Sequence, residues 1–139
     1  MNGTARTPRS IVLHARARAV LDRAAMRASE RERCGALFGR SADLELVVDD
    51  AVELANLEEH TERFRIDPGA LVACDRAAHA RGSELVGFFH THPSDRPRPS
   101  RADRAGAWEE HAVFVATTAG ARAFWPSADG FTELFMEGA

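Results

Sequence analysis

The sequence contains no lysine, no tyrosine and no glutamine, so all 18 of its basic residues are arginines. Without lysine, the protein cannot use Schiff-base catalysis or a lysine general base. The two cysteines, Cys34 and Cys74, form no Cys-x-x-Cys motif, which argues against a disulfide scaffold and favours a reducing compartment. No apolar run is long enough for a membrane span or for the core of a signal peptide. We therefore expect a cytoplasmic protein with no membrane partner.

The length and net charge of the chain further limit the class of protein that it can be. The chain has 139 residues, of which 45% are hydrophobic, so one globular domain with its own core is expected. The formal net charge of -3 argues against a nucleic-acid partner held by a basic surface. We take residues 1–9 as an N-terminal tail and residues 10–139 as the domain. The oligomeric state stays open, with a homodimer as one option.

The hydrophobic pattern predicts that helices and strands alternate along much of the chain. Short apolar runs bounded by glycine or polar turns predict strands over residues 10–13, 34–39, 44–54, 84–92, 112–117, 121–125 and 131–135. Phe64 and Ile66 indicate a further short extended piece. Helices are expected over residues 15–28, 67–81 and 100–108. The fold class is therefore α/β or mixed α+β, with a single mixed β-sheet flanked by helices.

The segment from His90 to Asp103 carries the most informative chemical pattern. His90 and His92 lie two apart at the end of a predicted strand, so their side chains project from the same face. Pro93 ends that strand and leaves its edge open. Two imidazoles on one face can share a metal ion, but a His-x-His pair also arises by chance at strand edges.

Ser100 and Asp103 follow at the start of a predicted helix and share one of its faces. By themselves they are typical of a helix cap, with Ser100 as N-cap and Asp103 in the first turn. The loop before them is short enough to fold this helix start back over the strand end. Asp103 would then be a third metal ligand and Ser100 a hydroxyl donor. Two histidines and a carboxylate suit a catalytic zinc ion, because they leave a fourth position for water.

A metal-activated water also needs a general base. Glu30 and Glu32 both precede the buried strand expected at residues 34–39. Either residue could equally be an exposed carboxylate in this run of alternating glutamate and arginine. Spacing alone does not choose between them.

Two stretches resemble the JAMM (MPN-plus) metallopeptidases. Residues 32–39, Glu-Arg-Cys-Gly-Ala-Leu-Phe-Gly, are similar to the Glu-x-Cys-Gly-x-Leu-x-Gly stretch of that family. Residues 90–103 resemble its His-x-His-Pro and Ser-x-x-Asp signature, with matching spacing. Softer matches at residues 64–68, Trp108 and residues 124–125 indicate the short bacterial branch that acts on sulfur-carrier or ubiquitin-like proteins. The likeness spans residues 10–135.

The resemblance implies a fold similar to that of cytidine deaminase and the activity of a zinc-dependent peptidase or isopeptidase. It implies His90, His92 and Asp103 as zinc ligands, Glu32 as general base and acid, and Ser100 as the oxyanion-stabilising residue. A metal-activated water would hydrolyse an amide bond. By family, that bond lies next to the C-terminal Gly-Gly tail of a small ubiquitin-like or sulfur-carrier protein. The bond itself could be a peptide, an isopeptide or an amino-acid adduct.

Three alternatives differ from this function. A non-catalytic MPN-type scaffold lacks the metal, and the complete set of five site residues counts against it. DNA-repair-associated relatives share the His-Pro-Ser run seen at residues 92–94, but the Cys-Gly strand is not typical of them. A zinc deaminase requires a Pro-Cys-x-x-Cys motif, which the sequence lacks.

Other residues carry weaker signals. Both cysteines are expected to be core thiols. Trp108 and Trp125 are expected in the core or against the sheet, with Trp108 close enough to line the site. Arg96 and Arg98, on the loop between predicted ligands, are either solvated or contact a substrate tail. The remaining histidines show no ligand spacing and are expected to be structural or exposed: His14, His60, His79 and His111.

Overall fold

The computed structural model describes residues 7–27, 32–58, 65–92, 97, 99 and 107–137. Two helices lie in this part of the chain, α1 (Ala15–Met26) and α2 (Pro68–Ala80). The same residues form seven strands: β1 (Ser10–Leu13), β2 (Cys34–Ala42), β3 (Glu45–Leu54), β4 (Glu84–Thr91), β5 (Ala112–Thr117), β6 (Gly120–Ser127) and β7 (Gly130–Glu137). The mixed α+β class with a strand-rich sheet is therefore confirmed.

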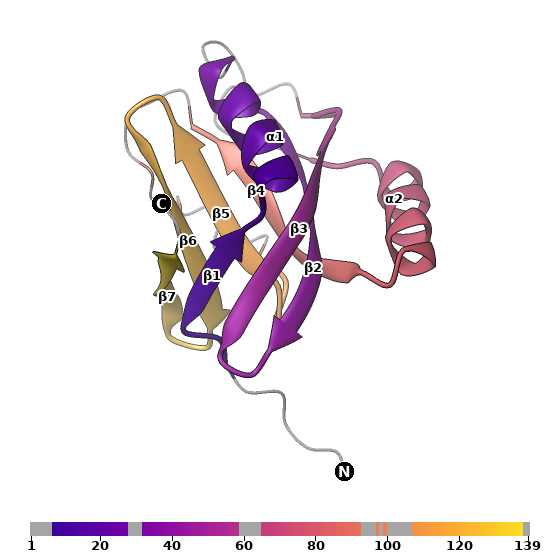
Figure 1. The fold of residues 1–139 in the computed structure, drawn as a ribbon. Coiled ribbons are helices and arrows are strands. Elements are labelled where there is room, and N and C mark those ends of the chain that lie inside the picture. Colours follow the sequence, from indigo (N-terminus) through magenta and orange to yellow (C-terminus); the bar gives the residue numbers. More distant parts are fainter. Residues whose placement is uncertain are drawn as a thin grey trace.

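The sheet closes into a barrel with the strand order β1-β3-β2-β4-β5-β6-β7 (Figure 1). Strand β1 completes the closure, because it pairs in parallel with both β3 and β7. Strand β2 runs antiparallel between β3 and β4. Strand β4 pairs in parallel with β5, and β5, β6 and β7 continue as an antiparallel meander. The start of β2 and the end of β4 therefore meet at one end of the barrel.

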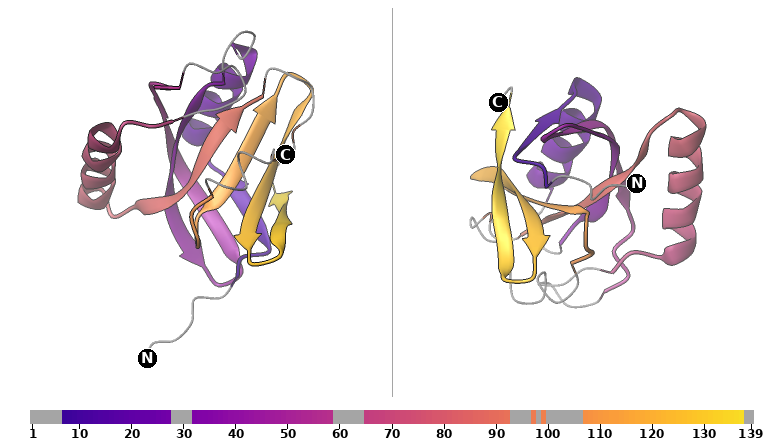
Figure 2. Two further views of the ribbon diagram at one scale, coloured as in Figure 1. Left: turned by 180° about the vertical axis from the view of Figure 1, so that it is seen from behind. Right: turned by 90° about the horizontal axis from the view of Figure 1, so that it is seen from below.

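The two helices pack on opposite faces of the sheet, α1 mainly over β3 and α2 over β4 and β3 (Figure 2). Helix α1 buries Leu21 in the main core, to which Leu37 of β2 also belongs. Helix α2 buries Ala78 against Ala36 and Phe38, the neighbours of Leu37. Side chains alternate between faces along a strand, so the apolar run in β2 supplies both layers at once. This explains why the run reads as continuously hydrophobic.

Helix α2 begins where the sequence predicts. The side chain of Asp67 accepts a hydrogen bond from the backbone N–H of Ala70 at 3.0 Å, and Pro68 occupies the first turn. Gly82 follows the helix with φ +83°, a conformation that favours glycine. The predicted N-cap and the stop at glycine are both confirmed.

Several strand and helix bounds differ from the prediction. Strand β2 runs on to Ala42, because the hairpin turn to β3 is a tight one in which Asp43 adopts φ 59°. Ile66 makes only an isolated antiparallel bridge, with Asn56, and Phe64 lies outside the described residues. The helix expected over residues 100–108 falls mostly outside them, and its last two residues, 107 and 108, are not helical.

Within the residues that the structure describes, neither helix has the length and apolar character needed to cross a membrane.

Candidate metal centre

The pairing of β2 with β4 places Glu32 beside the two histidines. Cys34, the first residue of β2, lies opposite His90 near the end of β4. When this antiparallel register is continued by two residues, Glu32 lies opposite His92. Because alternate residues share a face of a sheet, Glu32, His90 and His92 project to the same side. That side is the face of β2 that α2 covers further along the strand.

The three side chains converge closely. The Nε2 atoms of His90 and His92 lie 3.1 Å apart, and their ring centroids are separated by 4.9 Å. Candidate ligand atoms of Glu32, His90 and His92 all lie within 4.8 Å of one another. Two nitrogens bound to one tetrahedral zinc ion at 2.0–2.1 Å would be about 3.3 Å apart. The two imidazoles are thus spaced as ligands of a single ion would be.

Burial within the centre is graded. Glu32 and His90 are each 1% exposed, whereas His92 is partly exposed. Burying a carboxylate is costly unless it is paired or bound to a cation, so a cation held beside Glu32 fits the chemistry of this donor set. Of the three side chains, His92 is therefore the most accessible to solvent.

A reciprocal pair of hydrogen bonds fixes the backbone between these residues. The backbone N–H of Thr91 donates to the carbonyl of Arg33 at 2.8 Å, and the backbone N–H of Arg33 donates to Thr91 Oγ1 at 2.8 Å. The backbone N–H of His92 donates to the carbonyl of Ala116 on β5 at 3.1 Å. Arg33 follows Glu32 directly, and Thr91 separates the two histidines. The pair therefore fixes the spacing of the two backbone segments that carry the carboxylate and the imidazoles.

Cys34 sits next to these groups but is not one of the converging ligand residues. Burial, and to a smaller extent the nearby carboxylates of Glu53 and Glu32, together raise the pKa of the Cys34 thiol to about 12. Its Sγ lies 3.7 Å from the carbonyl oxygen of Leu54, as a weak donor would. The expectation of a core thiol is confirmed for Cys34. Cys74, on α2, is half-buried and packs beside Ala78.

A salt bridge flanks the centre on the β3 side. The Arg33 guanidinium donates through Nη1 to Glu53 Oε2 at 2.5 Å and through Nε to the carbonyl of Arg27 at 3.0 Å. Arg33, the residue after Glu32, thereby links the end of α1 to β3. Both side chains of the salt bridge are 29% exposed, so its role is to hold this segment in place rather than to add much stability.

Other predicted site residues lie outside the described part of the chain: Ser100, Asp103, Glu30, Arg96 and Arg98. The structure thus brings together three of the five residues assigned to the centre, and the roles of Ser100 and Asp103 stay predictions. Of the two candidate bases, Glu32 is the one that the structure places against the histidines.

The two tryptophans differ in their surroundings. Trp108 is 51% exposed and lies outside the core, and its contact with Phe88 confirms the expectation that it packs against the sheet. It packs edge-on against Phe88, with ring centroids 4.9 Å apart, because Phe88 faces outwards two residues before His90. Trp125 is partly buried and packs against the main core. Trp108 therefore lies on the same face of β4 as the histidines.

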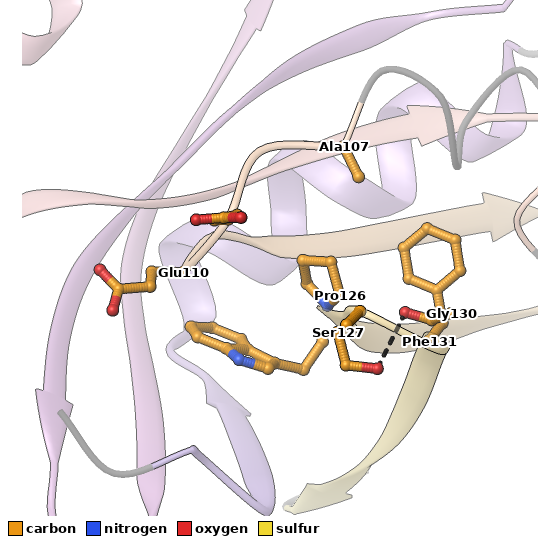
Figure 3. A pocket seen from close by; sticks show the side chains of 9 residues that line it. Ala107, Glu110, Pro126, Ser127, Gly130 and Phe131 are labelled. Atoms are coloured by element: carbon orange, nitrogen blue, oxygen red, sulfur yellow. Dashed lines mark hydrogen bonds between the residues drawn. The ribbon is translucent and has the colours of Figure 1, made fainter. Parts of the chain in front are cut away.

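A cavity of about 400 Å³ lies at the other end of the sheet (Figure 3). Glu109, Glu110, Trp125 and Phe131 are among the residues that line it. These residues flank the start of β5 and the turn between β6 and β7, whereas His90 lies towards the end of β4, which runs parallel to β5. The cavity is therefore separate from the candidate metal centre.

Two residues that hold the centre together were not predicted. They are Thr91, described above, and Asn56, whose Nδ2 donates to the backbone carbonyl of Glu32 at 2.7 Å. Thr91 contacts Arg33 from β4, and Asn56 contacts Glu32 from just beyond the end of β3. Their positions follow from the strand register, which this single sequence did not fix.

Comparison with known proteins gives consistent matches. Residues 9–127 match the family of prokaryotic homologs of the JAB domain. The chain is 31% identical over 112 residues to the desampylase of Haloferax volcanii. This alignment covers 80% of this chain and 76% of that protein. It superposes with TM-score 0.80 and 25% identity on a solution structure of a Desulfitobacterium hafniense protein, over 91% of this chain and 90% of the other. A Salinibacter ruber protein of 22% identity superposes with TM-score 0.60 over 91% of each chain, which shows a shared fold.

Proposed function

Because the chain belongs to the prokaryotic homologues of the JAB domain, we propose that it is a zinc-dependent peptidase or isopeptidase that hydrolyses an amide bond. The observation that carries this proposal is the convergence of Glu32, His90 and His92 within 4.8 Å at the junction of β2 and β4. The desampylase relative is an enzyme by its name. A binding module would not need a buried carboxylate facing two imidazoles.

The donor set fits zinc. His90 and His92 would hold the ion through imidazole nitrogens, and Asp103 is the predicted third ligand. When bound, zinc supplies water that ionises near neutral pH and a Lewis acid for the substrate carbonyl oxygen. The backbone bonds of Thr91 and His92 restrain the main chain that carries the two imidazoles.

Glu32 acts as the proton carrier. Its carboxylate takes a proton from the attacking water and returns it to the amine that leaves. Burial to 1% exposure keeps competing solvent away from this carboxylate. Ser100 is the predicted hydrogen-bond donor for the oxyanion that forms at the carbonyl.

The substrate we propose is the C-terminal Gly-Gly tail of a small ubiquitin-like or sulfur-carrier protein, with the cut next to that tail. The name of the desampylase relative describes the removal of a protein modifier. The burial of the site supports a slender substrate, because Glu32 and His90 are nearly inaccessible and only His92 of the three is partly exposed. Glycine has no Cβ, so a Gly-Gly backbone can approach closely where a bulkier segment cannot.

The direct test compares wild-type protein with Glu32→Gln and His92→Ala in cleavage of a Gly-Gly-tailed carrier adduct. We expect each variant to lower kcat/KM by at least about 100-fold, because each removes a group that acts in the transition state. Matched controls are Glu84→Gln, at the exposed start of β4, and His79→Ala, exposed on α2. Both controls should stay within about twofold of wild type. Wild-type rates in both site variants would overturn the assignment.

The scaffold alternative predicts a different result. A non-catalytic MPN-type domain would contain almost no zinc after zinc-supplemented expression and would cleave no adduct. Elemental analysis of the purified protein separates the two functions: a zinc ratio near one per chain supports the enzyme.

A further inference from the structure

Asn56 lies directly opposite Glu32, on the side away from His92. Cys34 pairs with Leu54 in the antiparallel β2–β3 ladder. Two residues further in both directions, the same register brings Glu32 and Asn56 face to face. Both residues lie just outside the strands, since β2 starts at Cys34 and β3 ends at Leu54. Main-chain pairing of the ladder therefore stops before it reaches Glu32.

The Asn56 carboxamide continues the ladder by one step. Its Nδ2 donates to the backbone carbonyl of Glu32 at 2.7 Å. A carbonyl at the end of a strand needs a donor when it is buried, and here a side chain supplies the donor that a partner strand would otherwise give. This hydrogen bond fixes the peptide unit from which the Glu32 side chain departs.

The other end of the same carboxamide holds a separate segment. Oδ1 accepts hydrogen bonds from the backbone N–H groups of Glu58 and Arg65, both at 2.9 Å. The bond to Glu58 is an Asx-type turn. The backbone N–H of Leu57 also donates to the carbonyl of Arg65 at 2.8 Å. Asn56 therefore links Glu32 to the two ends of the connection between β3 and α2.

We propose that Asn56 is a positioning residue for Glu32, acting through the backbone carbonyl of Glu32. The proposal rests on the function proposed above, because it assigns Glu32 the proton transfer. The Asn56 bond is made to the backbone carbonyl of Glu32 and not to its carboxylate. It restrains the main chain at Glu32 from the β3 side, while Thr91 restrains Arg33 from the β4 side.

Substitutions can distinguish the donor role of the Asn56 Nδ2 atom from the acceptor role of its Oδ1 atom. In Asn56→Asp, an acceptor oxygen remains for the N–H groups of Glu58 and Arg65, but the donor to Glu32 is lost and a carboxylate oxygen faces the carbonyl. In Asn56→Ala, both ends are lost. We expect both variants to lower kcat by about ten- to a hundredfold, because small displacements of a catalytic group cost this much. KM and bound zinc should stay within about twofold of wild type, because neither depends on this carbonyl.

Amide hydrogen exchange gives a readout that needs neither zinc nor substrate. Protection of the Glu58 and Arg65 amides should persist in Asn56→Asp and fall in Asn56→Ala. A merely structural role in the connection would make activity follow this protection, so that Asn56→Asp would have wild-type kcat. That result would overturn the proposal. If Asn56→Asp does not fold, Asn56→Ala decides: a wild-type kcat in a folded protein overturns the proposal, and a lowered kcat with unchanged KM supports it.

Ser83→Ala is the control for a general loss of stability. Ser83 Oγ donates to Asp49 Oδ2 at 2.7 Å, which joins the start of β4 to β3 far from the histidines. Its loss should lower the melting temperature and leave kcat unchanged. Inactive wild-type protein in the same assay would count against the proposed function itself, whereas the exchange measurement would still report on the bonds of Asn56.

Discussion

Cys34 shows how burial makes a thiol unreactive beside the candidate metal centre. It lies opposite His90 in the ladder, two residues from Glu32, yet burial and two nearby carboxylates raise its pKa to about 12. Metal ligation and nucleophilic attack both require the thiolate. The thiol therefore stays neutral at physiological pH and serves as a small core residue.

Cys34 should consequently resist alkylation in the folded protein. With iodoacetamide at pH 8, we expect Cys74, which is half-buried, to be labelled first and Cys34 to stay unmodified until denaturant is added. Peptide mass spectrometry of the native and denatured protein measures both sites. The variant Cys74→Ser isolates Cys34 as the control. Labelling of Cys34 in the native state at the rate of a free thiol would contradict its burial and raised pKa.

Glu32 marks the limit of what the residues alone could predict. Glu30 and Glu32 have the same chemistry and lie in the same charged run, and only the likeness to a family favoured Glu32. The physical reason for the choice is register: residue 32 continues the face that carries Cys34 and lies opposite His92. Register depends on pairing between segments nearly sixty residues apart, which local patterns do not contain.

At the level of elements, the sequence predicted type and order better than bounds. The seven strands and the first two helices appear in the predicted order. Their apolar runs, and the glycine and aspartate residues at which they begin or end, are local signals in the sequence. Closure of the barrel was not predicted. Strand β1 has only four residues, and its parallel pairing with β7 joins residues 10–12 to residues 135–137. No local sequence pattern indicates that these two distant segments pair.

The link between β2 and β4 gives a prediction at this scale. Thr91→Val keeps the shape of a buried side chain but removes the acceptor for the backbone N–H of Arg33. We expect a loss of about 1–3 kcal/mol in the free energy of unfolding, since the N–H group is left without its partner. Urea denaturation at equilibrium measures the loss. We also expect a reduced kcat, because the same bond sets the spacing of Glu32 from the histidines.

Thr91→Ser serves as the control, because it keeps the hydroxyl and loses only a methyl group. It should retain most of the activity, with a stability loss set by packing alone. Equal activity in the valine and serine variants would show that the hydroxyl does not position the centre.

For the molecule as a whole, the candidate centre lies at one end of the barrel and the cavity lies towards the other end. The start of β2 and the end of β4 meet at the upper end of the barrel in Figure 1. The cavity lined by Trp125 and Phe131 lies instead near the start of β5. The residues of the centre come from separate segments: Glu32 precedes β2, whereas His90 and His92 lie at the end of β4 and just after it. The predicted third ligand, Asp103, belongs to the connection between β4 and β5. An ion bound here would join segments that are otherwise linked only through the sheet.

Zinc should therefore stabilise the whole fold. A ligand that binds the folded state alone adds about 2.7 kcal/mol at a free concentration of 100 times its Kd, which for a domain of this size corresponds to a rise in Tm of about 10 °C. Differential scanning fluorimetry of chelator-treated protein, with and without added zinc, measures the shift. Magnesium should give none, because it prefers oxygen ligands. The double variant His90→Ala, His92→Ala should lose the zinc shift; an undiminished shift in that variant would place the stabilising ion elsewhere on the molecule.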